Sequence, residues 1–187
     1  MKTDPASGPS VPVVISSDKN WKANRMRQMA LRSSNHMPGV KRRKPYSDEW
    51  YTPPDLVKSL GPFDLDPCAG PMAHATINIV PPGDGLAFEW EGRVWLNPPY
   101  STVHEWLTKF ISHANGIALV NARPETEWFQ NFARGADGFL WLRRRIVFLQ
   151  ADGSASRPPV GSVLVAYGKQ NAVALVNSNL PGIYMSR

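Results

Sequence analysis

The chain has 187 residues, a length that suits one domain with a substantial core and leaves little room for a second. The formal net charge is +6, which suits a polyanionic partner without requiring one. The single cysteine excludes an internal disulfide and a cysteine-based zinc cage, and the four histidines lack ligand-like spacing. No apolar run is long enough to cross a bilayer, and residues 1–10 show no signal pattern. We therefore expect a soluble intracellular protein that binds neither membrane nor metal.

Residues 1–46 are expected to form a flexible, basic N-terminal segment, followed by the compact domain in residues 47–187. Residues 1–17 are rich in proline, serine and glycine, which is typical of disordered or loosely attached chain. A weak capping signal at residues 17–20 permits a short helix. Residues 25–44 hold seven basic residues and no acidic one. This stretch is either a solvated tail or an arm that contacts phosphates.

The first elements of the compact domain are a helix and three short strands. Thr52 is expected as the helix N-cap and Pro53 as its first helical residue. Leu56, Val57 and Leu60 would form its apolar face, and Gly61 with the following proline would end it. Strands are expected at residues 63–66, 76–80 and 94–96, where short apolar or β-branched runs end at proline or turn residues.

An amphipathic helix is expected next, with Ser101 or Thr102 as its N-cap. Its apolar residues recur at helical spacing: Val103, Trp106, Leu107, Phe110 and Ile111. Residues 117–120 predict a buried strand and residues 125–133 a second amphipathic helix. The remaining strands are expected at residues 138–141, 146–149, 162–167 and 172–176. Alternating strands and helices followed by clustered strands predict an α/β fold, with a mostly parallel sheet and an antiparallel edge.

A stiff polar turn follows the strand at residues 94–96. Asn97 is followed by Pro98, Pro99 and Tyr100, and the two prolines cannot continue a sheet ladder. Each proline also restricts the residue before it, so the backbone after Asn97 is rigid. An amide on a rigid turn at the carboxyl end of a strand is typical of active sites in α/β sheets. The alternative is a turn that merely ends the strand.

Asn97-Pro98-Pro99-Tyr100 resembles the catalytic motif of enzymes that transfer a methyl group from S-adenosylmethionine to adenine N6 in DNA. Three further segments follow the order of that family. Tyr51-Thr52-Pro53-Pro54 resembles the segment that covers the cofactor, and Leu65-Asp66-Pro67-Cys68-Ala69-Gly70 resembles the first cofactor-binding strand and loop. Asp84-Gly85-Leu86 resembles the element that holds the cofactor adenine. The chain thus resembles the Dam-type DNA N6-adenine methyltransferases of phages and prophages.

This resemblance implies a Rossmann-like class I methyltransferase fold, a cytoplasmic location in a bacterial host cell, and a GATC-like DNA target. It implies cofactor contacts from Tyr51, Thr52, Pro53, Asp66, Pro67, Cys68, Ala69, Asp84 and Leu86. Asp66 would bind the methionine ammonium group or only cap its strand. Asp84 would accept from the cofactor adenine or only shape a turn. Between Gly70 and Asp84 there is no acidic residue for the ribose hydroxyls.

The resemblance also implies how the motif would work. The catalytic residues would be Asn97, Pro98, Pro99 and Tyr100. The side-chain oxygen of Asn97 and the backbone carbonyl of Pro98 would accept hydrogen bonds from N6 and aim its lone pair at the methyl group. The target base must leave the duplex, and Tyr100 would stack on it. Phe148 would pack on its other face or is simply a core strand residue.

Basic residues supply the implied contacts with double-stranded DNA. The candidates are Lys41, Arg42, Arg43, Lys44, Arg143, Arg144, Arg145 and Arg157. Whether they read guanine edges or hold phosphates is left open, as is the oligomeric state. We therefore predict an S-adenosylmethionine-dependent DNA adenine N6-methyltransferase. The alternatives are a methyltransferase that uses the same motif on RNA or on a protein glutamine, and a non-catalytic DNA-binding module on this fold.

Overall fold

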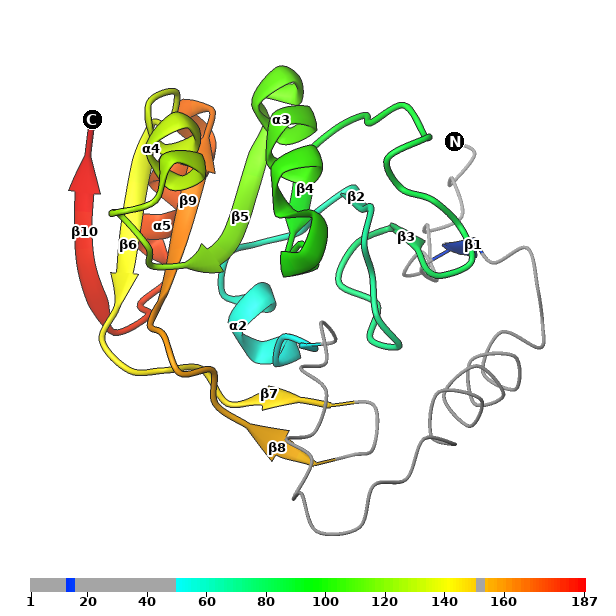
Figure 1. Ribbon diagram of the computed structural model, residues 1–187, viewed down its shortest axis with the longest axis horizontal. Coiled ribbons are helices and arrows are strands. Elements are labelled where there is room, and N and C mark those ends of the chain that lie inside the picture. Colours follow the sequence, from blue (N-terminus) through cyan, green and yellow to red (C-terminus); the bar gives the residue numbers. More distant parts are fainter. Residues whose placement is uncertain (1–12, 16–49, 151–153) are drawn as a thin grey trace, which may run out of the picture.

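The structure, a computed structural model, describes residues 13–15, 50–150 and 154–187 (Figure 1). Within these residues, eight strands form one sheet in the order β1-β3-β2-β4-β5-β9-β6-β10. On one side lie β1 (Val13–Ile15), β3 (Ile77–Ile79), β2 (Leu65–Asp66), β4 (Val94–Leu96) and β5 (Gly116–Asn121). On the other lie β9 (Ser162–Tyr167), β6 (Gly138–Leu142) and β10 (Gly182–Ser186).

The type of strand pairing divides this sheet into a parallel part and an antiparallel part. The five strands from β1 to β5 in the sheet order are parallel. Beyond them, β9 is antiparallel to both β5 and β6, and β10 is antiparallel to β6. The expected α/β class is confirmed. An antiparallel strand was expected only at the edge of the sheet, and β10 fits this expectation. Strand β9 does not, because it is antiparallel to its neighbours and lies inside the sheet.

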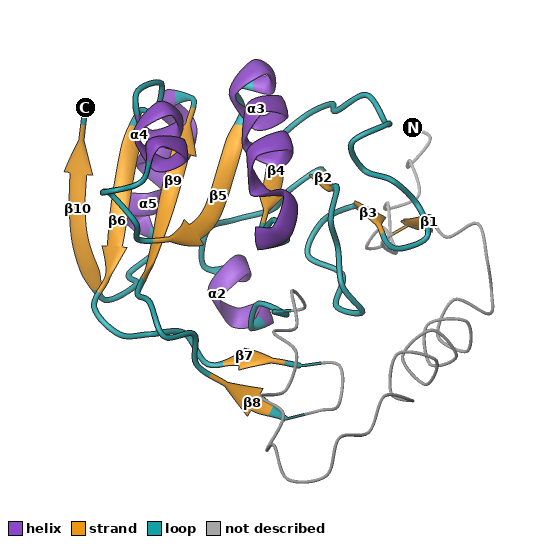
Figure 2. Ribbon diagram, in the orientation of Figure 1, coloured by secondary structure: helices purple, strands orange, loops and turns teal. Residues whose placement is uncertain are grey.

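Helices cover both faces of the sheet (Figure 2). On one face lie α3 (Val103–His113) and α4 (Glu127–Ala133), and on the other α2 (Pro54–Lys58) and α5 (Lys169–Asn177). Helix α3 buries the stripe predicted from its spacing: Val103, Trp106, Leu107 and Phe110. Ile111, expected on the same stripe, is 37% exposed and lies at its margin. None of the helices in the described residues is long and apolar enough to cross a membrane.

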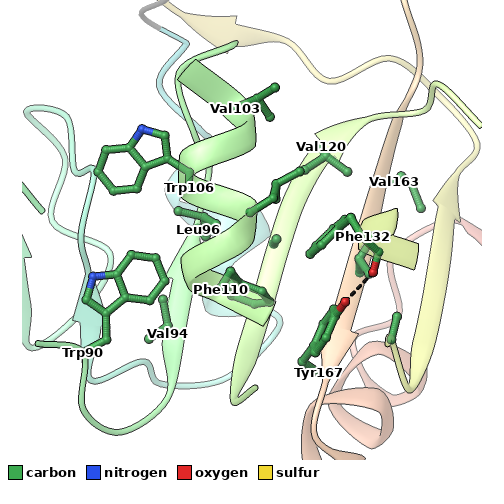
Figure 3. Close-up of a cluster of buried hydrophobic side chains, with 14 of the residues drawn as sticks. Trp90, Val94, Leu96, Val103, Trp106, Phe110, Val120, Phe132, Val163 and Tyr167 are labelled. Atoms are coloured by element: carbon green, nitrogen blue, oxygen red, sulfur yellow. Dashed lines mark hydrogen bonds between the residues drawn. The ribbon is translucent and has the colours of Figure 1, made fainter. Parts of the chain in front are cut away.

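Aromatic side chains dominate the core between α3, α4 and the sheet (Figure 3). Trp90 stacks on Trp106 of α3, with ring centroids 6.3 Å apart. Phe132 of α4 stacks on Tyr167 of β9, with ring centroids 5.4 Å apart, and the Tyr167 hydroxyl donates to the Phe132 carbonyl. Each large apolar side chain buried in this way contributes about 1.5–3 kcal/mol, so the core fixes α3 firmly on β4 and β5.

Residues 169–177 form α5, and the expectation of a strand at residues 172–176 was wrong. Ala172 and Leu175, three residues apart, face the sheet, whereas Val173 and Val176 are 57% and 54% exposed. Valine lowers helix propensity by only a fraction of a kcal/mol, so packing of one helical face decides the structure. The strand beside β6 is instead β10, which the sequence pattern did not predict.

The helix starts differ from the expected ones in one respect. Pro53 is the N-cap of α2 and Pro54 its first residue, so the expectation of Thr52 as N-cap was wrong. Thr52 is 1% exposed, and its hydroxyl accepts a hydrogen bond from Asn97 instead. Before α3, residues Tyr100–Thr102 form a single 3-10 turn, η1, and Thr102 is the N-cap of α3.

A two-stranded sheet, β7 (Phe148–Leu149) with β8 (Ala155–Ser156), projects beyond the carboxyl end of β6 (Figure 1). Tyr51 bridges to Leu149 through reciprocal backbone hydrogen bonds of 2.9 and 3.1 Å. An isolated hairpin is marginally stable in water, so this attachment anchors it to the segment that precedes α2.

Two expectations concern residues 1–49. The helix signal at residues 17–20 and the basic stretch at residues 25–44 lie outside the described residues. Strand β1, which pairs in parallel with β3, lies in a stretch where no element was expected.

Candidate active site

A cavity of about 440 Å³ lies at the carboxyl ends of β2, β3 and β4, beside residues 50–52. We call it the first cavity. Seven of the residues predicted to contact a cofactor line it: Tyr51, Thr52, Asp66, Pro67, Cys68, Ala69 and Asp84. Pro53 and Leu86, also predicted, are not among its lining residues. The structure therefore brings together three segments that are separate in sequence.

Asp66 is the buried carboxyl group of this cavity. It is 2% exposed, and its Oδ1 accepts a hydrogen bond of 3.2 Å from the backbone N–H of Cys68. Burial raises the pKa of Asp66 from 3.8 to about 7, and the Cys68 hydrogen bond opposes this only in part. Among the described residues, no cationic side chain pairs with it. A buried carboxyl group without a cation is unusual, and it suits a cationic ligand in the cavity.

Asp84 lies on a loop that is held against the first cavity. Its Oδ1 accepts the backbone N–H of Leu86 at 2.9 Å, so Asp84 does shape a turn, and it also lines the cavity. The indole of Trp90 donates to the Gly85 carbonyl at 2.8 Å, and the Lys109 ammonium donates to the carbonyls of Leu86 and Phe88. The Trp90 bond closes the loop on itself, and the Lys109 bonds fix it to α3.

Gly85 allows this loop to approach the loop after β2. A β-carbon at residue 85 would come within 1.8 Å of the Pro67 carbonyl oxygen, far inside any real contact. The Cys68 thiol in turn donates to the backbone carbonyl of Asn97 at 3.2 Å. The loops that begin at Pro67 and Asp84 and the turn at Asn97 therefore form one packed unit around the cavity.

The orientation of the Asn97 amide is fixed by two hydrogen bonds. Its Nδ2 donates to the Trp50 carbonyl at 2.7 Å and to the Thr52 hydroxyl at 3.1 Å. The Trp50 carbonyl can only accept, so the nitrogen must face it and the oxygen must point elsewhere. The structure gives Asn97 Oδ1 no donor within the described residues. Asn97 thus presents a free, oriented acceptor.

A second cavity of about 380 Å³ adjoins the first, and Trp50 and Asn97 line both. Tyr100 and Phe148 line this second cavity together. The Tyr100 hydroxyl accepts the backbone N–H of Asn121 at 2.5 Å, which fixes its ring, and burial raises its pKa. Phe148 is 4% exposed and meets the Trp50 ring edge-on at 5.6 Å. Phe148 is therefore both a core residue and a wall of the cavity.

The sequence reasoning missed several residues of the second cavity, among them Trp50, Asn121, Arg123 and Ser162. One signal for Asn121 was present, because it is a polar residue at the end of a buried strand, as Asn97 is. No motif marks the others. Asn78 also lines the first cavity, but it does not supply the missing contact with the ribose hydroxyls. Its side-chain amide is already hydrogen-bonded to the backbone of His74 and Ala75.

The predicted DNA-contacting residues fall into two groups. Arg143, Arg144 and Arg145 are exposed on the connection between β6 and β7, and Arg157 is exposed just after β8. Pro158, which accepts a hydrogen bond of 3.4 Å from Arg145, lines the second cavity. The other group, Lys41, Arg42, Arg43 and Lys44, lies outside the described residues.

In the described part of the chain, no group of three or more histidine, cysteine or acidic residues could hold a metal ion.

Two adjoining cavities at the carboxyl ends of strands are where α/β proteins usually bind their ligands. The family model described as DNA N-6-adenine-methyltransferase (Dam) matches residues 39–177. The chain therefore belongs to this family, which confirms the resemblance carried by its four motifs.

Two phage proteins are similar to parts of the chain, and both are named DNA N-6-adenine-methyltransferase. The protein of Haemophilus phage HP1 (strain HP1c1) is 34% identical over 97 residues, which cover 46% of this chain and 55% of that protein. The protein of Escherichia phage T1 is 30% identical over 106 residues, which cover 51% of this chain and 44% of that protein. The chain thus spans about half the length of the curated relatives it matches.

Proposed function

We propose that this protein transfers a methyl group from S-adenosylmethionine to N6 of an adenine flipped out of duplex DNA. The observation that carries the proposal is the Asn97 amide, which lies between two adjoining cavities with its oxygen free to accept. Family membership supports the same chemistry. The names of the two phage relatives agree with it.

The first cavity suits the methyl donor. Its volume of about 440 Å³ falls in the range of small-molecule sites, about 300–1,000 Å³. The buried carboxyl group of Asp66, which meets no cationic side chain among the described residues, would hold the methionine ammonium. The second oxygen of Asp84 would accept from the adenine amino group. Bound S-adenosylmethionine would supply an electrophilic methyl group. The fold that we infer is the Rossmann-like class I methyltransferase fold, supported by parallel strands whose carboxyl ends carry the cavity.

The second cavity suits the target base. Tyr100 and Phe148 would stack on its two faces, which typically contributes about 1–3 kcal/mol per base and offsets part of the cost of flipping. Asn97 Oδ1 and the Pro98 carbonyl would accept the two N6 hydrogens, so the lone pair would point toward the first cavity. Both acceptors are uncharged and weakly basic. They would stabilise the positive charge that develops on N6 and leave its proton to solvent after transfer.

The DNA backbone would meet the basic residues near the second cavity. Arg143, Arg144, Arg145 and Arg157 are exposed close to the hairpin and to residues that line this cavity. Exposed arginines at the mouth of a base pocket suit phosphates, and the net charge of +6 agrees.

The test is transfer of a tritiated methyl group from S-adenosylmethionine to duplex DNA with and without GATC, to RNA and to protein. We expect label on adenine N6 of duplex DNA, and Asn97→Ala should lower the rate about 10²–10³-fold. Asn177→Ala, which removes an exposed amide on α5, is the matched control and should keep the wild-type rate.

Two alternatives predict other results. Label on RNA or glutamine instead of DNA would establish the other substrate class. DNA binding without cofactor binding or transfer would establish a non-catalytic module and overturn the proposal.

A further inference from the structure

Four polar residues of the second cavity have no role in the proposed methyl transfer: Asn121, Arg123, Thr126 and Ser162. Arg123 pairs with Glu125, and the Thr126 hydroxyl donates to the Arg123 carbonyl, which leaves Asn121 and Ser162. Asn121 ends β5 and Ser162 begins β9, and the two residues face each other in the antiparallel register. Side chains directly opposite in such a pair lie about 4.5–5.5 Å apart at their β-carbons, so a side-chain rotation could join them by a hydrogen bond, which the structure itself does not contain. They therefore form one polar pair in the wall of the cavity.

This pair lies on the same face of the sheet as Asn97. Side chains alternate along β5, so Asn121 shares its face with Leu119, which lines the same cavity. The register of Leu96 with Ala118 sets Asn97 level with Leu119 on the neighbouring strand. Strand spacing and rise then separate the α-carbons of Asn97 and Asn121 by about 8 Å. A planar base between Tyr100 and Phe148 would lie within reach of both amides.

The polar atoms of the pair are available. Only the backbone of Asn121 is used, because its N–H donates to Tyr100 and its carbonyl accepts from Arg123. For the Asn121 amide and the Ser162 hydroxyl, the described residues provide no hydrogen-bond partner, although Ser162 is only 4% exposed. Neither polar end is among the buried, unsatisfied side-chain atoms of the described residues, so both are accessible from the cavity and can bind a ligand there.

We propose that Asn121 is a further substrate-binding residue, whose Nδ2 donates to the ring nitrogen that flanks the amino group of the target base. Ser162 would donate to Asn121 Oδ1 and so hold the amide in this orientation. The inference rests on the proposed function of the second cavity and adds the residue that fixes the base within it.

The chemistry of the base edge supports different roles for Asn97 and Asn121. Adenine presents an amino donor at C6 with ring acceptors, N1 and N7, on either side of it. Asn97, whose nitrogen is engaged, can only accept, while Asn121 can donate. Two stacking rings leave a base free to rotate in its plane, whereas a second in-plane hydrogen bond stops that rotation and keeps N6 aligned.

The experiment measures single-turnover methyl transfer to a duplex that carries one target adenine, first identified by mapping methylated DNA. The same duplex is then made with C–H in place of N1, and separately in place of N7. Wild type and Asn121→Ala are compared on all three substrates, with Asn177→Ala as the control. Calorimetry with S-adenosylmethionine and thermal melting check that the first cavity and the fold are intact. Ser162→Ala tests whether Ser162 holds the Asn121 amide in place, and it removes less side-chain volume than Asn121→Ala does.

We expect Asn121→Ala to lower the rate on adenine about ten- to hundredfold, with cofactor affinity unchanged. The wild-type rate should fall by a similar factor on one of the two analogues. On that analogue Asn121→Ala should react as fast as wild type, because the same hydrogen bond is already absent. The analogue that loses activity identifies N1 or N7 as the partner. Equal rates for wild type and Asn121→Ala on adenine, or losses that multiply on both analogues, would overturn the inference. No methylation of adenine by wild type would instead overturn the proposed function.

Discussion

The replacement Asp66→Asn tests whether the buried carboxyl group is held in the fold for a cationic ligand. Burial raises the pKa of Asp66 from 3.8 to about 7. Each tenfold change in proton affinity corresponds to 1.36 kcal/mol, so keeping Asp66 ionised in the ligand-free protein costs about 4 kcal/mol. Asparagine keeps the shape and the acceptor for the Cys68 N–H but carries no charge.

The sign of the pH effect follows from proton binding. Between pH 4 and 7 the unfolded chain has Asp66 ionised while the native state keeps it protonated, so stability falls as the pH rises through this window. The asparagine variant lacks this dependence. We expect it to be more stable than wild type at pH 8 by up to about 4 kcal/mol and nearly equal to it at pH 4.

The assay is urea unfolding of both proteins at pH 4.5, 6 and 8, followed by titration with S-adenosylmethionine. Other groups titrate equally in both proteins, so the difference in unfolding free energy isolates Asp66. Cofactor affinity should be lost in the variant, and in wild type it should weaken below pH 7 because the carboxyl group must ionise to meet the ammonium group. A constant stability difference across pH, or a variant that binds cofactor as wild type does, would refute the reasoning.

Two further replacements test the geometry around the first cavity. Gly85→Ala should lower stability by about 1–3 kcal/mol and weaken cofactor binding, because its β-carbon would strike the Pro67 carbonyl. Gly161→Ala is the control, because a β-carbon at residue 161 would have no atom within 4 Å. Thermal melts and calorimetry should show neither change for Gly161→Ala. Asn97→Asp should slow methyl transfer more than tenfold because a carboxylate oxygen would replace the nitrogen that faces the Trp50 carbonyl; a wild-type single-turnover rate would contradict this.

The sequence predicted the elements whose pattern is strong and local. The stripe from Val103 to Phe110 has helical spacing and is buried as expected, and the apolar run of β4 ends at the prolines that follow Asn97. Residues 162–167 form β9 with the predicted bounds. In each of these segments local propensity and tertiary packing favour the same structure, so the pattern alone is sufficient.

The sequence did not predict features that depend on distant partners. The β-branched residues Val173 and Val176 favour a strand in the sequence pattern. The segment is a helix because Ala172 and Leu175 pack against the sheet, which the local sequence does not reveal. Thr52 reads as a helix cap because nothing local reveals that Asn97 will use its hydroxyl. The motifs located the first cavity. Asn121 and Ser162 were missed because their proximity arises from strand order, which places β9 beside β5.

Residues 50–52 connect the Asn97 turn, the loop after β2 and the hairpin. Trp50 and Thr52 orient the Asn97 amide, and the Tyr51 ring lies against the α-carbon of Gly70 in the loop after β2. The backbone of Tyr51 also pairs with Leu149 in the hairpin that carries Phe148. Any shift of this hairpin would therefore be transmitted to the residues that orient the Asn97 amide and to those that border the first cavity. Under the proposed function, entry of the base and alignment of the Asn97 amide would depend on each other, since both rest on the same three residues.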